Sequence, residues 1–293
     1  MKRKGLFLLA KFIILVVTIL HVIPVVWDLP ASYRQLRMLQ PNSGLSGWTQ
    51  TELQSAAQSA GLSPRFLGTV LFTASLTCLL AFWVMAGLMY WFKGNSWIGL
   101  LSMYILSGTG VGFAFLIIDR AVLPGWATGF YNFTAASLWP TFFMLIYLFP
   151  DGHFVPRWSR FLAPFPFIVF VFAAWYGDEK TPGWFLGLLL LYLLGGLISQ
   201  SYRYRRASSA EQRQQTKWVF YAMAVLVVNV ILGKVAPLLF PALAAKTGAG
   251  FYFDVGYNYL LGVLFSALLP ISIGFSILRY RLWDIDVLIR RTL

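Results

Sequence analysis

The chain has 293 residues, of which 59% are hydrophobic and 11% are charged, and its mean hydropathy is +0.71. A soluble globular domain of this size needs a larger polar share to cover its surface, so the composition excludes that class and predicts a polytopic membrane protein. The formal net charge of +13 does not predict nucleic-acid binding, because the lysines and arginines cluster at the ends of apolar runs. The single cysteine, Cys78, excludes an intramolecular disulfide and a multi-cysteine metal site.

The first apolar run, residues 6–27, directly follows the basic residues at 2–4. About 20 apolar residues are enough for a helix to cross the hydrocarbon core of a bilayer. A cleaved signal peptide is the alternative, but the run is long for one and no clear small-residue cleavage site follows it. We therefore expect an uncleaved first helix whose N-terminus is cytoplasmic.

Residues 28–67 form the longest polar stretch and are expected to be an extracytoplasmic loop. Within it, Thr49 and Glu52 have the spacing of a capping box, in which each side chain bonds the backbone N–H of the other residue. This pattern predicts the start of a short helix, and Gly61 is a suitable stop.

Seven further apolar runs predict an all-α bundle over residues 1–278 with about eight transmembrane helices. Fifteen of the 23 Lys and Arg residues fall in segments that this arrangement places in the cytoplasm, against six outside, which agrees with the positive-inside rule. Both termini are therefore expected to be cytoplasmic. The further spans are approximately 68–92, 97–118, 130–149, 161–176, 184–200, 217–240 and 257–278.

The span at 161–176 is the shortest, and Pro164 and Pro166 lie near its start. If it were re-entrant, every later segment would change sides. The basic loop at 201–217 would then face outward, which the charge rule opposes.

Polar side chains within the apolar runs are candidates for function, because they are costly in lipid. Lys234 lies about one and a half turns from the outer end of its run. It either extends its ammonium group to the outer headgroups or lines an outward-facing cavity and pairs with a carboxylate, Asp254 or Asp119. The candidate intramembrane site comprises Lys234, Asn229, Asp254, Asp119 and His21, with Asn132 and Asn258 expected at a similar depth.

The sequence contains no recognisable catalytic, cofactor or metal-binding constellation. It has two histidines, His21 and His153, and neither lies on a soluble helix beside an acidic residue, as a phosphoacceptor histidine does. The glycines of the GTGVG motif, Gly108, Gly110 and Gly112, lie inside an apolar run and not between a strand and a helix. Close helix packing explains them better than phosphate binding does.

The basic loop at 201–217 has two interpretations. Its arginines can contact anionic lipid headgroups, or they can form a cytoplasmic docking surface for Asp284 and Asp286 of the tail. The candidate docking residues are Arg203, Arg205, Arg206 and Arg213.

Residues 279–293 form a cytoplasmic tail that continues the apolar pattern of the final span. Apolar residues recur at alternating steps of four and three, which is the seam of a short coiled coil, although a short amphipathic cap would show the same pattern. Asp286 and Arg290 have the favourable order for a helical ion pair. The candidate output helix contains Leu278, Leu282, Ile285, Asp286, Ile289 and Arg290.

Three stretches carry a resemblance to a known family: Leu148–Trp158 (LFPDGHFVPRW), Glu211–Val219 (EQRQQTKWV) and the tail LRYRLWDIDVLIRRTL. In the same order, they resemble two cytoplasmic loops and the closing segment of the multi-helix membrane region of a group of bacterial sensor histidine kinases. His153 departs from the family, in which an arginine is expected. The chain also stops at Leu293, where the family continues into further membrane helix and the kinase.

The resemblance implies a membrane sensor and anchor region in the bacterial cytoplasmic (inner) membrane. It would pass an outer or intramembrane stimulus through its C-terminal helix to a histidine kinase or response-regulator system, in cis or in trans, as a homodimer and without catalytic residues of its own. A small-molecule or ion transporter or channel is the main alternative, which the absence of inverted repeats opposes. An intramembrane enzyme acting on lipids is a third, for which a nucleophile and base are lacking.

Overall fold

The computed structural model describes residues 2–41, 45, 47–114, 125–148, 153–162, 165–167, 183–207, 210–246 and 248–276. Within these ranges the secondary structure is helical without strands, which confirms the all-α class. The long helices are α1 (Lys2–Arg37), α3 (Pro64–Lys93), α4 (Trp97–Phe113), α5 (Gly125–Leu148), α7 (Gly183–Tyr202) and α8 (Ala210–Leu239). The shorter elements are α2 (Gln50–Ser59), the 3₁₀ turn η2 (Arg157–Phe161), the π turn η4 (Arg203–Ala207), α9 (Pro241–Ala244), α10 (Ala249–Tyr252) and the π-helix η5 (Phe253–Leu261). Because α10 and η5 continue into residues 262–276 without a break, we call the whole segment helix 249–276.

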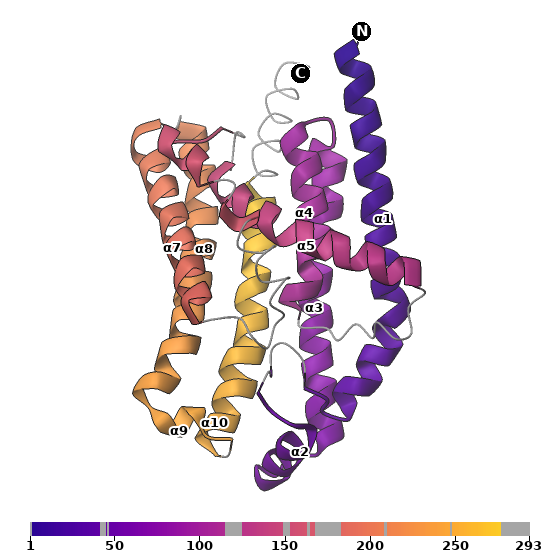
Figure 1. Cartoon of the computed structure of the whole chain (residues 1–293), viewed down its shortest axis with the longest axis vertical. Helices are drawn as coiled ribbons and strands as arrows, with labels where there is room; N and C mark the ends of the chain where they lie inside the picture. Colours follow the sequence, from indigo (N-terminus) through magenta and orange to yellow (C-terminus); the bar gives the residue numbers. More distant parts are fainter. Residues whose placement is uncertain are drawn as a thin grey trace, which may run out of the picture.

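The helices form two groups that α5 joins (Figure 1). One group contains α1, α3 and α4, the other contains α7, α8 and helix 249–276, and α5 runs across both of them. The start of α1, the α3–α4 turn and the α7–α8 turn lie at one end of the bundle, here called the N-terminal end. The opposite end holds α2, α9 and α10 and is called the α2 end.

Among the described residues, four helical segments are long and apolar enough to cross a bilayer: Gly5–Arg37, Pro64–Lys93, Lys217–Leu239 and Ala249–Ser276. The protein is therefore a helical membrane protein. Gly99–Phe113 is apolar but shorter, while α5 is helical over residues 130–148 of the fourth predicted span and α7 covers the predicted span at 184–200. Of the predicted span at 161–176, residues 168–176 lie outside the described ranges. The number of eight spans and the sides of the termini stay predictions.

The first helix is longer than its apolar run. α1 continues ten residues into the 28–67 stretch, because its inward face continues through the buried residues Asp28, Ser32 and Leu36, spaced four apart. Its 36 residues correspond to about 54 Å, against about 30 Å for a hydrocarbon core. The predicted outer loop thus begins as a helical extension.

The predicted capping box is present at the start of α2. Thr49 Oγ1 accepts from the Glu52 N–H at 3.3 Å, and Glu52 Oε2 accepts from the Thr49 N–H at 2.7 Å. The helix ends at Ser59, and Gly61 follows with a φ of +74°, which favours glycine. Both predicted boundaries of this short helix are confirmed.

Two of the three GTGVG glycines are positions of close helix packing. A Cβ atom on Gly108 would lie 2.1 Å from the Leu138 side chain of α5, and one on Gly110 would lie 2.7 Å from Phe82 of α3. Gly112 is exposed. Gly108 and Gly110 therefore allow α4 to approach its neighbours, as predicted.

A chain of aromatic contacts passes through the crossing of α5. Phe82 of α3 stacks on Phe113 of α4 with ring centroids 5.5 Å apart, and Phe113 meets Phe142 of α5 at 5.4 Å. On the other side, Phe143 of α5 meets Tyr192 of α7 at 6.1 Å. Each such pair contributes about 0.5–1.5 kcal/mol beyond the area it buries, so α5 holds the two helix groups together.

Candidate functional site at the α2 end

Helix 249–276 begins with a rare local geometry. Its nine residues Phe253–Leu261 form a π-helix, and the N–H of Gly262 bonds the carbonyl of Tyr257, five residues back. Segments of this kind are uncommon in helices and occur frequently at functional sites.

Asp254, in the first turn of this π-helix, is bound from two sides. The indole N–H of Trp48 donates to Asp254 Oδ2 at 2.7 Å, and the amide of Asn258 donates to Oδ1 at 2.7 Å. Trp48 is buried and also meets the ring of Phe251 at 6.1 Å. Since Trp48 lies just before α2, the segment between α1 and α3 is fastened to the start of helix 249–276.

Two more hydrogen bonds hold the π-helix against neighbouring helices. The Tyr257 hydroxyl donates to the backbone carbonyl of Asn229 on α8 at 3.3 Å, and the hydroxyls of Tyr259 and Ser75, on α3, lie 2.8 Å apart. Tyr259 and Ser75 are fully buried, where a hydroxyl without a partner would be costly. Contacts to Trp48, α8 and α3 thus fix the rotation of the first half of helix 249–276 about its axis.

An exposed ion pair lies beside this cluster. Lys246 Nζ is 3.0 Å from Glu52 Oε2. The hydrogen bond from the Thr49 backbone, together with Lys246, lowers the pKa of the Glu52 carboxyl below its ordinary value. The charged Glu52 carboxyl therefore stabilises the folded state at neutral pH, and this stabilisation is lost as the pH falls through the lowered pKa. An exposed pair adds little stability, but it places α2 next to the link between α9 and α10.

The predicted intramembrane residues do not form one cluster. Lys234 is exposed on α8, and both Asp254 oxygens bind Trp48 and Asn258, so the predicted Lys234–Asp254 pair is not formed. Asn229 is half-buried, and its side-chain oxygen has no hydrogen-bond partner among the described residues. Asp119 and the side chain of Asn132 lie outside the described part of the chain.

His21 belongs to the contact between α1 and α4. It is buried and hydrogen-bonds to the backbone of Gly108. Two turns further along the same face of α1, Asp28 is also buried and accepts a hydrogen bond from Ser32 at 3.4 Å. Asp28 was not among the predicted site residues because it marks the end of the apolar run, although its spacing of seven from His21 indicates a shared helix face.

Replacing Lys234 by methionine is expected to change the free energy of unfolding by less than about 0.5 kcal/mol, because the side chain is exposed and has no charged partner within the described ranges. Thermal unfolding of the purified variant in detergent measures the change. A loss of several kcal/mol would instead show that the ammonium group is a buried partner of a carboxylate.

The predicted docking residues differ sharply in exposure. Arg203 is only 2% exposed, and its Nη2 donates to the backbone carbonyls of Tyr147, at 3.3 Å, and of His153. It holds the end of α5 and the backbone at His153 against the end of α7. Docking of the tail on this loop stays a prediction, because the tail lies outside the described residues. Arg205 is exposed. The side chains of Arg206 and Arg213 lie outside the described part.

A small apolar cavity lies beside the second half of helix 249–276. Its volume is about 20 Å³, room for about one water-sized group, and its apolar lining excludes a well-bonded water. The predicted output helix that follows this region, from Leu278 to Arg290, lies outside the described residues. The residues that line the cavity are Phe142, Leu145, Ile146, Val219, Met223, Leu269 and Ile273.

Within the described ranges, no group of three His, Cys, Asp or Glu side chains could hold a metal ion. Comparison of the chain with protein-family models, with curated proteins and with solved structures finds no match. The cluster around Asp254 is therefore interpreted from its own geometry. That geometry links the segment before α2 to the start of a membrane-length helix.

Proposed function

We propose that the chain is the membrane sensor and anchor region of a bacterial signalling system in the cytoplasmic membrane. It passes a stimulus at its α2 end to a cytoplasmic histidine kinase or response-regulator system, in cis or in trans. The observation that carries the proposal is the Trp48–Asp254 hydrogen bond, because it joins the predicted outer segment to helix 249–276, which leads directly into the predicted output tail. The three stretches that resemble sensor histidine kinases support the same function.

The π-helix supports a movement between two discrete arrangements. If one wide turn tightens to α-helical geometry, the residues beyond it move by one position, which is about 100° of rotation and about 1.5 Å along the axis. Trp48 contacts the first turn of this segment, at Asp254. A stimulus that displaces Trp48 therefore changes the relative stability of the two arrangements.

The second half of helix 249–276 has features that allow such a movement. Leu269 and Ile273 border the apolar cavity, so their side chains have some free space on that side. Pro270 is buried between them and lacks a backbone N–H, which removes one bond from the helix ladder. Rotation of this half would turn the predicted seam of the tail relative to a second copy of the chain.

Cysteine cross-linking in membranes tests the proposal. With Cys78→Ser as background, single cysteines at positions 282, 285 and 289 are expected to cross-link strongly between two copies, and those at 284 and 287 weakly. Asp254→Leu removes the acceptor of Trp48 and is expected to shift cross-linking from position 285 to 284 or 286. Arg65→Gln, an exposed change near the same end, should leave the pattern unaltered.

Two outcomes would contradict the proposal. Equal cross-linking at all positions, or none, would rule out a paired output helix. A seam pattern that Asp254→Leu leaves unchanged would show that the α2 end does not control the tail.

A further inference from the structure

The turn η2 at the N-terminal end of the bundle presents an unusual exposed surface. Trp158 is 44% exposed and Phe161 is 69% exposed, and the side chains of Arg157 and Arg160 are exposed as well. The guanidinium of Arg160 lies 4.8 Å from the centroid of the Phe161 ring. Ser159 points inward and donates to the Pro156 carbonyl at 2.8 Å. Two basic and two aromatic side chains thus share one short turn.

This turn is held firmly on the rest of the protein. The Ser199 hydroxyl of α7 donates to the Val155 carbonyl at 2.6 Å, and Arg203 donates to the carbonyl of His153. Both donors lie near the end of α7, next to the α7–α8 turn. The surface is therefore preorganised, and it lies at the end of the bundle that holds the basic start of α1.

From this surface we infer that η2 is a binding site for an anionic phospholipid. Guanidinium groups of Arg157 and Arg160 match the oxygens of a phosphate, and residues 153–162 contain no acidic side chain that would compete for them. Trp158 and Phe161 supply apolar surface at the level where indole and phenyl rings meet the glycerol and upper acyl chains. Free phosphate would use only the arginines, so the exposed aromatic rings favour a lipid.

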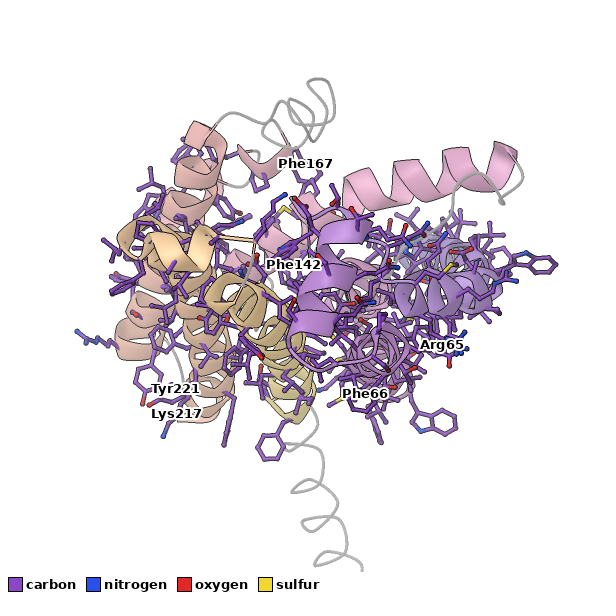
Figure 2. The ribbon with its side chains drawn as sticks, turned by 90° about the horizontal axis from the view of Figure 1, so that it is seen from below. Arg65, Phe66, Phe142, Phe167, Lys217 and Tyr221 are labelled. Carbon is purple, nitrogen blue, oxygen red and sulfur yellow. The ribbon has the colours of Figure 1, made fainter. Side chains whose placement is uncertain are left out.

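The chain offers a matched control for this site. Lys217 also has an aromatic partner, with its Nζ 5.9 Å from the Tyr221 ring, and both side chains point away from the bundle on α8 (Figure 2). Arg65, next to Phe66, is exposed on a different part of the surface (Figure 2). The double variant Arg65→Gln/Lys217→Gln therefore removes two exposed charges, one of them beside an aromatic ring, without touching η2.

Binding is measured on the purified full chain in detergent, by native mass spectrometry with added phosphatidylglycerol or phosphatidylcholine. Phosphatidylglycerol is expected to bind the wild type more tightly than phosphatidylcholine. Arg157→Gln/Arg160→Gln should weaken phosphatidylglycerol binding roughly 25-fold, because each basic residue near an anionic headgroup contributes about fivefold. The control variant should retain the wild-type affinity, and the helical circular dichroism of both variants should be unchanged.

Added salt should weaken phosphatidylglycerol binding to the wild type more than to Arg157→Gln/Arg160→Gln, since salt screens exposed charges. Equal weakening in the two double variants would mean that general positive charge, and not η2, attracts the lipid. Equal binding of the two lipids would overturn the proposal. If inorganic phosphate competes for η2 as strongly as phosphatidylglycerol does, the ligand of this site is a free anion and not a lipid.

Discussion

Replacing Arg203 by methionine is expected to lower the free energy of unfolding by about 3 kcal/mol. The buried guanidinium donates to the carbonyls of Tyr147 and His153, and hydrogen bonds from charged groups are worth about 1.5–3 kcal/mol each. Methionine fills similar space but donates no hydrogen bond. The carbonyl of Tyr147, on α5, and the carbonyl of His153, before η2, therefore both lose this donor.

Thermal unfolding in detergent measures the loss, and limited proteolysis near residues 153–162 should become faster. Arg65→Met is the control, because this arginine is exposed and should change the free energy of unfolding by less than about 0.5 kcal/mol. Equal stability of the two variants would show that Arg203 does not hold this segment.

Replacing Gly68 by alanine is expected to destabilise the protein by about 2 kcal/mol or more. A Cβ atom at this position would lie 2.1 Å from the backbone carbonyl oxygen of Leu36, so α1 and α3 must move apart. Overpacking costs about 1–3 kcal/mol and sometimes more, and a backbone clash this short falls at the upper end of that range or beyond it. Subtracting the gain of about 1 kcal/mol in helix propensity leaves a net loss of about 2 kcal/mol or more. The clash is with backbone, which cannot rotate away as a side chain can.

The same helix provides the control for Gly68. Gly87 is exposed on α3, and a Cβ atom there would have nothing within 4 Å. Gly87→Ala should therefore be neutral or slightly stabilising in the same unfolding measurement. If both variants unfold alike, the close approach of α1 and α3 at Leu36 is not required for stability.

Local patterns in the sequence predicted local structure well. Thr49 and Glu52 predicted the start of α2 because a capping box depends only on residues three apart. Gly108 and Gly110 predicted close packing because small residues inside an apolar run allow helices to approach. The four membrane-length helices follow from the length of their apolar runs.

Contacts between distant residues were not predictable in the same way. Trp48 and Asp254 are 206 positions apart, and no local pattern connects them. Counting Lys and Arg treats each as a surface charge, so it could not show that Arg203 is buried among carbonyls. An apolar run also gives the length of a helix but not the direction of its axis, which is why the crossing of α5 was not foreseen.

The transverse position of α5 has a consequence for assembly of the protein during synthesis. The ribosome produces α1, α3 and α4 first, and α5 can pack on this group as soon as it emerges. Its contacts through Phe143, however, require Tyr192, which is synthesised about 50 residues later. Until α7 arrives, Phe143 and Tyr147 of α5 would lack their aromatic partner Tyr192, so chains interrupted in this interval should be recognised by membrane proteases. Completion of α7 would then be the step that commits the bundle to its final form.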